Sequence, residues 1–138
     1  MRKVIAVLAI ITGLIGCKRD NAVEPAPYGK FQYKAYDSSG TLVVEGWMTL
    51  AIQDTARITG AWHLTKVDDP QNIGPQLGDG ELVGEFHDGS VLINLNPGFA
   101  DNNVFLSGQF AADTFSGTWN WSGFAGILNR GNFQARRQ

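Results

Sequence analysis

Glycine and aromatic residues recur two positions apart in this chain, within runs that alternate apolar and polar side chains. The clearest run is residues 115–121, where Phe115, Gly117 and Trp119 share one face of a strand with Trp121. A period of two is that of a β-strand, whose successive side chains point to opposite faces. The same phrase returns as Gly60-Ala61-Trp62, Gly84-Glu85-Phe86, Gly108-Gln109-Phe110 and Gly131-Asn132-Phe133. The repetition predicts one all-β unit.

Eight strands are expected, separated by segments rich in Asp, Asn, Ser and Gly. They are residues 30–36, 42–52, 57–64, 81–86, 91–95, 104–110, 114–121 and 126–136. Each strand has one apolar and one mostly polar face, and no segment keeps a helical period. Eight short sequential strands predict an antiparallel up-and-down barrel, whose closure removes both sheet edges. A two-sheet β-sandwich is the alternative.

The glycines on the apolar faces require an explanation, because each lowers the stability of the fold by about 0.5 to 1 kcal/mol in a strand interior. They are Gly46, Gly60, Gly84, Gly108, Gly117 and Gly131. In a small barrel, a missing side chain lets the sheet curve and leaves room for a large ring from a neighbouring strand. These glycines are therefore interpreted as architecture.

The N-terminus has the order of a secretory signal. Two basic residues, Arg2 and Lys3, precede an apolar run over residues 4–15, which is shorter than the roughly 20 residues that span a bilayer. The following Leu14-Ile15-Gly16-Cys17 resembles the lipobox of bacterial lipoproteins. That resemblance implies cleavage before Cys17 and acylation of this cysteine, for instance with palmitate; a plain signal peptide with an incidental cysteine is the alternative.

The expected organisation is a signal peptide over residues 1–16, a lipidated cysteine and flexible tether over 17–29, and a barrel domain over 30–138. Several acyl chains would make a lasting anchor. The predicted location is the bacterial cell envelope, with the choice of inner or outer membrane open. Loss of residues 1–16 removes Arg2 and Lys3 and no acidic residue, so the net charge falls from −2 to about −4. No basic stripe predicts a nucleic-acid partner.

The barrel pattern resembles the avidin and lipocalin group of calycins, which show Gly-x-Trp or Gly-x-aromatic strands and often an arginine near the last strand. The matching pieces are Gly117-Thr118-Trp119, Gly60-Ala61-Trp62, Gly108-Gln109-Phe110 and Arg136. The first strand departs from the lipocalin pattern, with Gly29-Lys30-Phe31 in place of Gly-x-Trp, and the biotin contacts of avidins have no counterpart. The resemblance implies an architecture and no ligand.

A binding site is expected at one end of the barrel. In a meander, alternate connections meet at the same end, and the connection over residues 65–80 is long enough to suggest function. The expected lining combines inward residues near that end with aromatic residues of its loops: Trp62, Leu64, Leu82, Leu95, Phe99, Trp121, Phe124 and Asn129. The alternative is that these side chains only plug the barrel.

Catalytic chemistry is not expected. His63 and His87 fall on polar faces, and no Ser, Cys or carboxylate has a spacing that predicts a nucleophile with its base. Oxygen ligands for calcium at residues 68–72 or 101–103 lack regular spacing, so no metal or cofactor is predicted. Trp47 lies out of phase on a polar face, which indicates a β-bulge or an exposed contact.

The function predicted is a non-enzymatic, membrane-anchored binding module for a small molecule or peptide. The alternative is an interaction protein with a solid barrel, which contacts another envelope protein through Trp47 or the loop tips.

Overall fold

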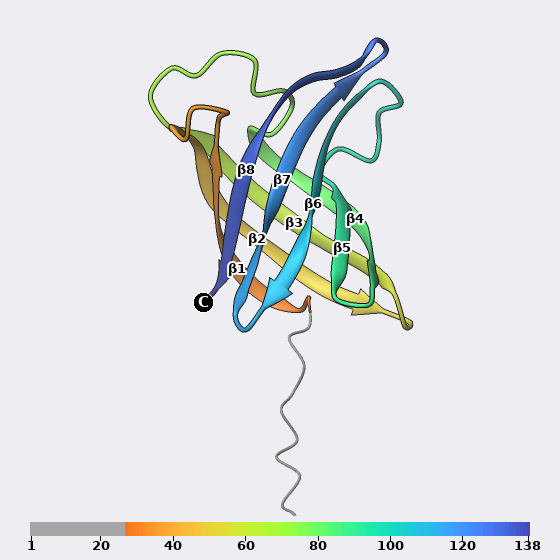
Figure 1. The fold of residues 1–138 in the computed structure, drawn as a ribbon. Helices are drawn as coiled ribbons and strands as arrows, with labels where there is room; N and C mark the ends of the chain where they lie inside the picture. The colour runs from red at the N-terminus through yellow and green to blue at the C-terminus, as the bar shows by residue number, and fades with distance from the viewer. Residues whose placement is uncertain (1–26) are drawn as a thin grey trace, which may run out of the picture.

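A computed structural model describes residues 27–138 as an eight-stranded barrel (Figure 1). The predicted signal peptide and Cys17 lie outside the described residues. The strands are β1 (Gly29–Tyr36), β2 (Leu42–Gln53), β3 (Arg57–Lys66), β4 (Gly78–His87), β5 (Ser90–Asn94), β6 (Asn102–Ala111), β7 (Thr114–Gly123) and β8 (Gly126–Arg137). All eight predicted strands are confirmed, with bounds that differ by at most three residues.

The sheet is antiparallel throughout and closed. Each strand pairs with the next, and β8 pairs with β1 from Phe31↔Arg137 to Tyr36↔Asn132. The up-and-down barrel is confirmed and the sandwich alternative is wrong. Among the described residues, closure of the sheet and the buried core both lie within Gly29–Arg137.

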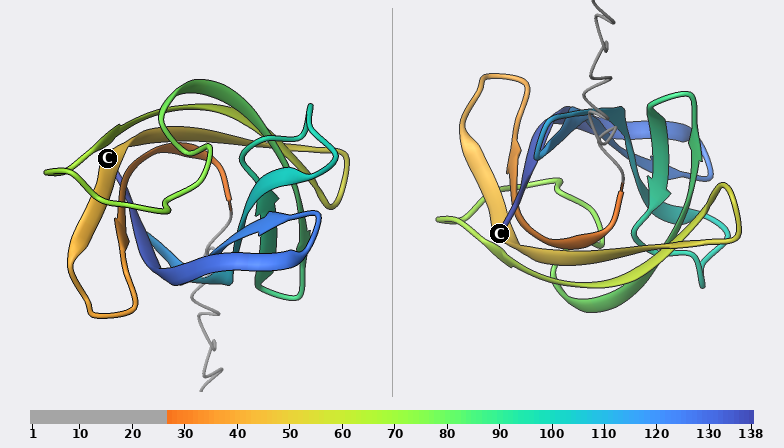
Figure 2. Two further views of the ribbon diagram at one scale, coloured as in Figure 1. Left: turned by 90° about the horizontal axis from the view of Figure 1, so that it is seen from above. Right: turned by 90° about the horizontal axis from the view of Figure 1, so that it is seen from below.

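The two ends of the barrel differ. The connections after β2, β4 and β6 are tight turns of two or three residues, and β1 starts and β8 finishes at that end (Figure 1). At the opposite end, residues 67–77 form a long connection that crosses the opening (Figure 2). The predicted contrast between a tightly closed end and a loop-rich end is confirmed. We call residues 67–77 the strap.

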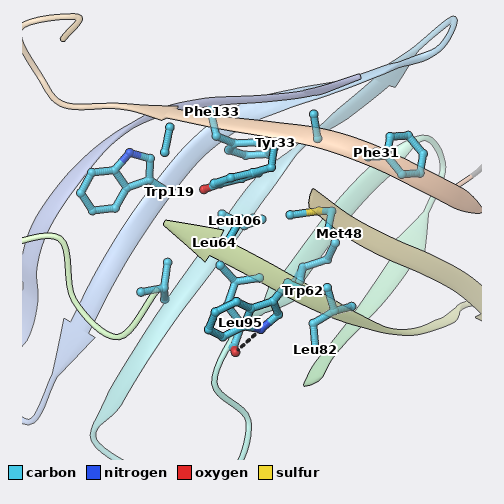
Figure 3. Close-up of a cluster of buried hydrophobic side chains, with 14 of the residues drawn as sticks. Phe31, Tyr33, Met48, Trp62, Leu64, Leu82, Leu95, Leu106, Trp119 and Phe133 are labelled. Atoms are coloured by element: carbon cyan, nitrogen blue, oxygen red, sulfur yellow. Dashed lines mark hydrogen bonds between the residues drawn. The ribbon is translucent and has the colours of Figure 1, made fainter. Parts of the chain in front are cut away.

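Side chains fill the barrel interior. Near the short-turn end the rings of Phe110, Phe115 and Phe133 form a continuous series, with centroids 5.0 Å apart for the first pair and 4.7 Å for the second. Figure 3 shows Met48, Leu64 and Leu106 among the rings further along. The interior is thus a packed core, as in other small barrels.

Of the two arginines at the end of β8, Arg137 and not the family-matching Arg136 packs against β1. The Arg137 guanidinium lies 5.3 Å from the Phe31 ring centroid and 4.6 Å from that of Tyr28. Arg136 is exposed and lies 3.4 Å from an Asp113 carboxylate oxygen.

Two register shifts change which residues face inward. Ala35 pairs with Val44 and Tyr36 with Leu42, so Val43 is the extra residue. Alternation along β2 predicts Leu42 on the inner face, but Val43 is buried in its place. A second shift lies between Trp121 and Ser122 and places Ile127 opposite Ser122.

Alternation along β8 predicts Ile127 on the inner face with Gly131 and Phe133. That prediction is wrong, because the second shift leaves Ile127 59% exposed. At Trp47 the pairing is regular on both sides, with Gln32 and His63, so the β-bulge interpretation is wrong there.

Candidate functional site

The strap is tied to the barrel wall at several points. Near its start, the Val67 amide donates to the Val43 carbonyl at 2.9 Å. This carbonyl is available because Val43 is the extra residue of β2 and has no partner on β1. Further along, the Asn129 side-chain amide donates to the Asn72 carbonyl at 2.8 Å. Ile73, only 7% exposed, adds an apolar contact with the core. The strap is therefore part of the barrel's packing.

Gln76 closes the opening from inside. Its side chain is fully buried, its amide donates to the Ile73 carbonyl at 2.6 Å, and its carbonyl oxygen lies 3.4 Å from the Tyr33 hydroxyl, which donates to it. Complete burial raises the pKa of Tyr33 above its ordinary range, because the phenolate cannot be solvated there. The Tyr33–Gln76 pair therefore satisfies two polar groups that the strap has sealed from water.

The tryptophans of this end use their indole N–H groups internally. Trp62 donates to the Leu95 carbonyl at 2.8 Å, the dashed contact of Figure 3, and Trp119 donates to the Tyr36 carbonyl at 2.8 Å. Trp121 donates to the Asn102 side chain, also at 2.8 Å. These rings offer a ligand their faces and edges and no free donor.

One glycine of the strap and one of β4 fit against those rings. A Cβ at Gly74, where φ is +71°, would lie 2.5 Å from Trp121 Cγ, and one at Gly80 would overlap the Trp62 ring. Only a residue without a side chain allows this approach.

One pocket opens on the Trp62 side of the strap, with a volume of about 420 Å³. It lies between the end of the strap, the start of β4 and the connection between β5 and β6. Trp62 and Leu95 form its apolar floor, and Leu77 and Phe99, which are 42% and 61% exposed, form its rim. We call it the Trp62 pocket.

A second hollow of about 340 Å³ lies on the other side of the strap. Its apolar surface comes from Val43, Ile73 and Trp119, and its polar surface includes Asp37, Asp68, Asp69 and Asn129. We call it the Trp119 hollow. Hydrogen bonds to Asp37, chiefly from the Ser39 hydroxyl, lower the pKa of that carboxyl, and a bond from Lys66 does the same for Asp69.

The eight predicted site residues do not form one pocket. Trp62, Leu95 and Phe99 come together in the Trp62 pocket, whereas Asn129 lines the Trp119 hollow. Leu64 and Leu82 lie in the core, Trp121 packs partly buried beneath Gly74, and Phe124 is 93% exposed at the β7–β8 turn.

Sequence reasoning missed the strap residues Pro75 and Leu77, which line the Trp62 pocket, and Gln76, which plugs the barrel. The only signal for them was the length of their connection, since no periodicity marks which side of an irregular loop faces inward.

The outer wall carries a row of side chains across neighbouring strands. The Trp47 ring stacks on His63 with centroids 6.1 Å apart, the Lys30 ammonium lies 5.0 Å from the Trp47 ring centroid, and His63 Nδ1 lies 2.7 Å from an Asp79 carboxylate oxygen. Within residues 27–138, no three His, Cys, Asp or Glu side chains gather as a metal-binding group.

Comparisons with models of protein families, with curated proteins and with solved structures find no match for this chain. Among the described residues, no helix is long and apolar enough to cross a bilayer.

Proposed function

We propose that this protein is a lipid-anchored, non-catalytic binding module of the bacterial cell envelope, with a calycin-like barrel. Its ligand is a small, largely apolar molecule held at the loop-rich end. The observation that carries the proposal is the Trp62 pocket, because its position, size and lining together suit such a ligand.

The volume of this pocket falls in the range of small-molecule sites, about 300 to 1,000 Å³. Its floor is apolar and its one indole donor is already bonded, so shape and apolar contact would supply most of the affinity. Asn96 and Asn102, together with the carboxylates of Asp79 and Glu81, supply the polar groups that orient a ligand.

The packed interior argues against a ligand inside the barrel. Gln76 and the rings of the core occupy that space, so binding takes place on the core and beside the strap.

The anchor proposal rests on the lipobox pattern at Cys17. Because β1 begins at the short-turn end, a tether that leads into β1 joins the barrel at the end opposite the Trp62 pocket. Cys17→Ser is expected to abolish acyl labelling and membrane retention, and unchanged membrane fractionation would contradict the anchor.

A small-molecule screen with the unlipidated chain tests the pocket. The spectrum of backbone and indole N–H groups is recorded with each compound, and hits are expected to shift Trp62 and residues 95–99. Phe99→Ala should weaken these hits, whereas Leu92→Ala, a change of a similarly exposed side chain outside the pocket, should not. A screen whose hits leave Trp62 unmoved, or that gives none, refutes the pocket as a ligand site.

The second candidate function is that of an interaction protein. The filled interior favours it, since a solid barrel presents only its surface to partners. Exposed apolar side chains at the loop-rich end favour it as well, namely Leu77, Phe99, Phe124, Ile127 and Leu128.

A further inference from the structure

The upper part of β8 has a free sheet edge. On one side β8 pairs with β7 along its whole length, but on the other side β1 reaches only as far as Asn132. Residues 126–131 therefore have no neighbouring strand on the β1 side. The β7–β8 hairpin extends past the barrel at this point (Figure 1). We call residues 126–131 the free β8 edge.

The free edge is also apolar. Ile127 and Leu128 are 59% and 50% exposed, and Phe124 in the adjoining turn is 93% exposed. An exposed strand edge with apolar side chains is a template for pairing with another chain, and natural proteins normally cover or charge such edges. Here Arg130 is the only charged residue of the stretch.

The surroundings of this edge are acidic. The four connections at the loop-rich end, residues 37–41, 67–77, 95–101 and 124–125, contain four aspartates and no lysine or arginine. Three of these aspartates, Asp37, Asp68 and Asp69, line the Trp119 hollow together with Asn129 of the free edge. The hollow thus lies directly beside the unpaired side of β8. Asp69 is paired with the Lys66 ammonium at 2.8 Å, so the net negative charge of the hollow comes from Asp37 and Asp68.

We propose that the free β8 edge docks an extended segment of another polypeptide, in which apolar side chains alternate with basic ones. The segment bonds to the main chain at residues 126–128 and places its apolar side chains against Phe124, Ile127 and Leu128. A lysine or arginine of the segment enters the Trp119 hollow. Strand addition of this kind takes affinity from main-chain hydrogen bonds and specificity from alternate side chains.

The local hydrogen bonds limit where pairing takes place. The Arg130 amide is already bonded to the Asn129 side-chain oxygen at 2.9 Å, and the Asn129 amide holds the strap. The added segment therefore pairs above Asn129 and crosses the hollow with the rest of its length.

Charge decides between this partner and two others. An anionic bilayer surface would be repelled by the four aspartates. A second copy of this chain, paired through the same edge, would bring two acidic ends together, and like charges at an interface oppose association. A segment with basic and apolar side chains is not repelled by these aspartates. This proposal does not depend on a ligand in the Trp62 pocket, which lies on the other side of the strap.

The test is selection from a random twelve-residue peptide library displayed on phage. The target is the unlipidated chain that begins at Cys17, biotinylated on that thiol. Enriched sequences are expected to alternate apolar residues with Lys or Arg. Absence of enrichment, or enrichment of sequences without basic residues, refutes the proposal.

Variants then locate the binding of a selected peptide. Leu128→Lys should raise its Kd at least tenfold, whereas Leu92→Lys, at a side chain of almost equal exposure on β5, should leave it within twofold. Asp68→Asn with Asp69→Asn should raise the Kd several-fold at low salt and less at high salt, because charge attraction is screened.

Equal losses for Leu128→Lys and Leu92→Lys would overturn the proposal. Two other results would also overturn it. In the first, the chain binds vesicles rich in anionic lipid, and Leu128→Lys abolishes that binding but not binding of the peptide. In the second, the chain dimerises in a concentration-dependent way, and Leu128→Lys abolishes dimerisation but not binding of the peptide.

Discussion

Replacing Gly117 by alanine tests why glycine recurs on the inner face of this barrel. Gly117 of β7 lies opposite Gly108 of β6, and a Cβ at Gly117 would lie 2.6 Å from Gly108 Cα and closer still to the Ser107 carbonyl oxygen. Ordinary contacts begin at about 3.4 Å. The neighbouring strand would therefore have to move by more than an ångström, and backbone atoms held in a ladder cannot do so freely.

The expected cost follows from two opposing terms. Overpacking in a well-packed core costs about 1 to 3 kcal/mol, towards the upper end when the opposing atoms are backbone. Alanine has less conformational freedom than glycine in the unfolded chain, which returns about 0.4 to 1 kcal/mol. Gly117→Ala is therefore expected to destabilise the barrel by about 2 kcal/mol.

Urea unfolding of the unlipidated chain measures this cost. With a slope of about 1.5 kcal/mol per molar urea, the midpoint should fall by more than 1 M. Gly98→Ala is the matched control, because that position has open space around it and no positive φ; its midpoint should stay within about 0.3 M of the wild type. If the two variants unfold at the same midpoint, the steric account of the inner glycines is wrong.

Three further changes probe the strap and the loop-rich end. Gln76→Ala should destabilise the protein by about 1 to 3 kcal/mol and speed amide exchange in the strap, since it leaves a buried hydroxyl without its acceptor; exposed Gln71→Ala should do neither. Trp119→Phe removes the donor to the Tyr36 carbonyl and should lower stability by a similar amount, measured by thermal unfolding. Because hydrogen bonds lower the pKa of Asp37, its contribution to stability is complete above its ordinary pKa of 3.8 and is lost as the pH falls through the folded value. In Asp37→Asn, the free energy of unfolding should therefore fall less steeply with decreasing pH below about pH 4. The same pH dependence in the variant and the wild type would contradict this role of Asp37.

The sequence predicted the fold because the interior pattern is repeated in every strand. Glycine and aromatic residues two positions apart indicate a curved sheet with one apolar face, and the short turns allow only adjacent pairing. The strand bounds and the contrast between the two ends followed from the same local signals.

The candidate site was predicted only in part. Trp62, Leu95 and Phe99 were placed correctly at one end, yet the predicted cluster is divided by the strap into two separate hollows. Nothing in an irregular segment indicates that Gln76 enters the barrel, because the burial of a loop residue depends on partners distant in the chain, here Tyr33.

The sequence by itself determined the eight antiparallel strands and favoured a closed barrel over a sandwich, since alternation and turn chemistry act over a few residues. Only the tertiary structure decided how the loop-rich end is sealed and where it stays open. Register shifts at Val43 and beside Trp121 move side chains from one face to the other, and β1 ends before β8 does. Those details depend on how strands of unequal length pair when the sheet closes. The residue pattern within a single strand does not show that pairing.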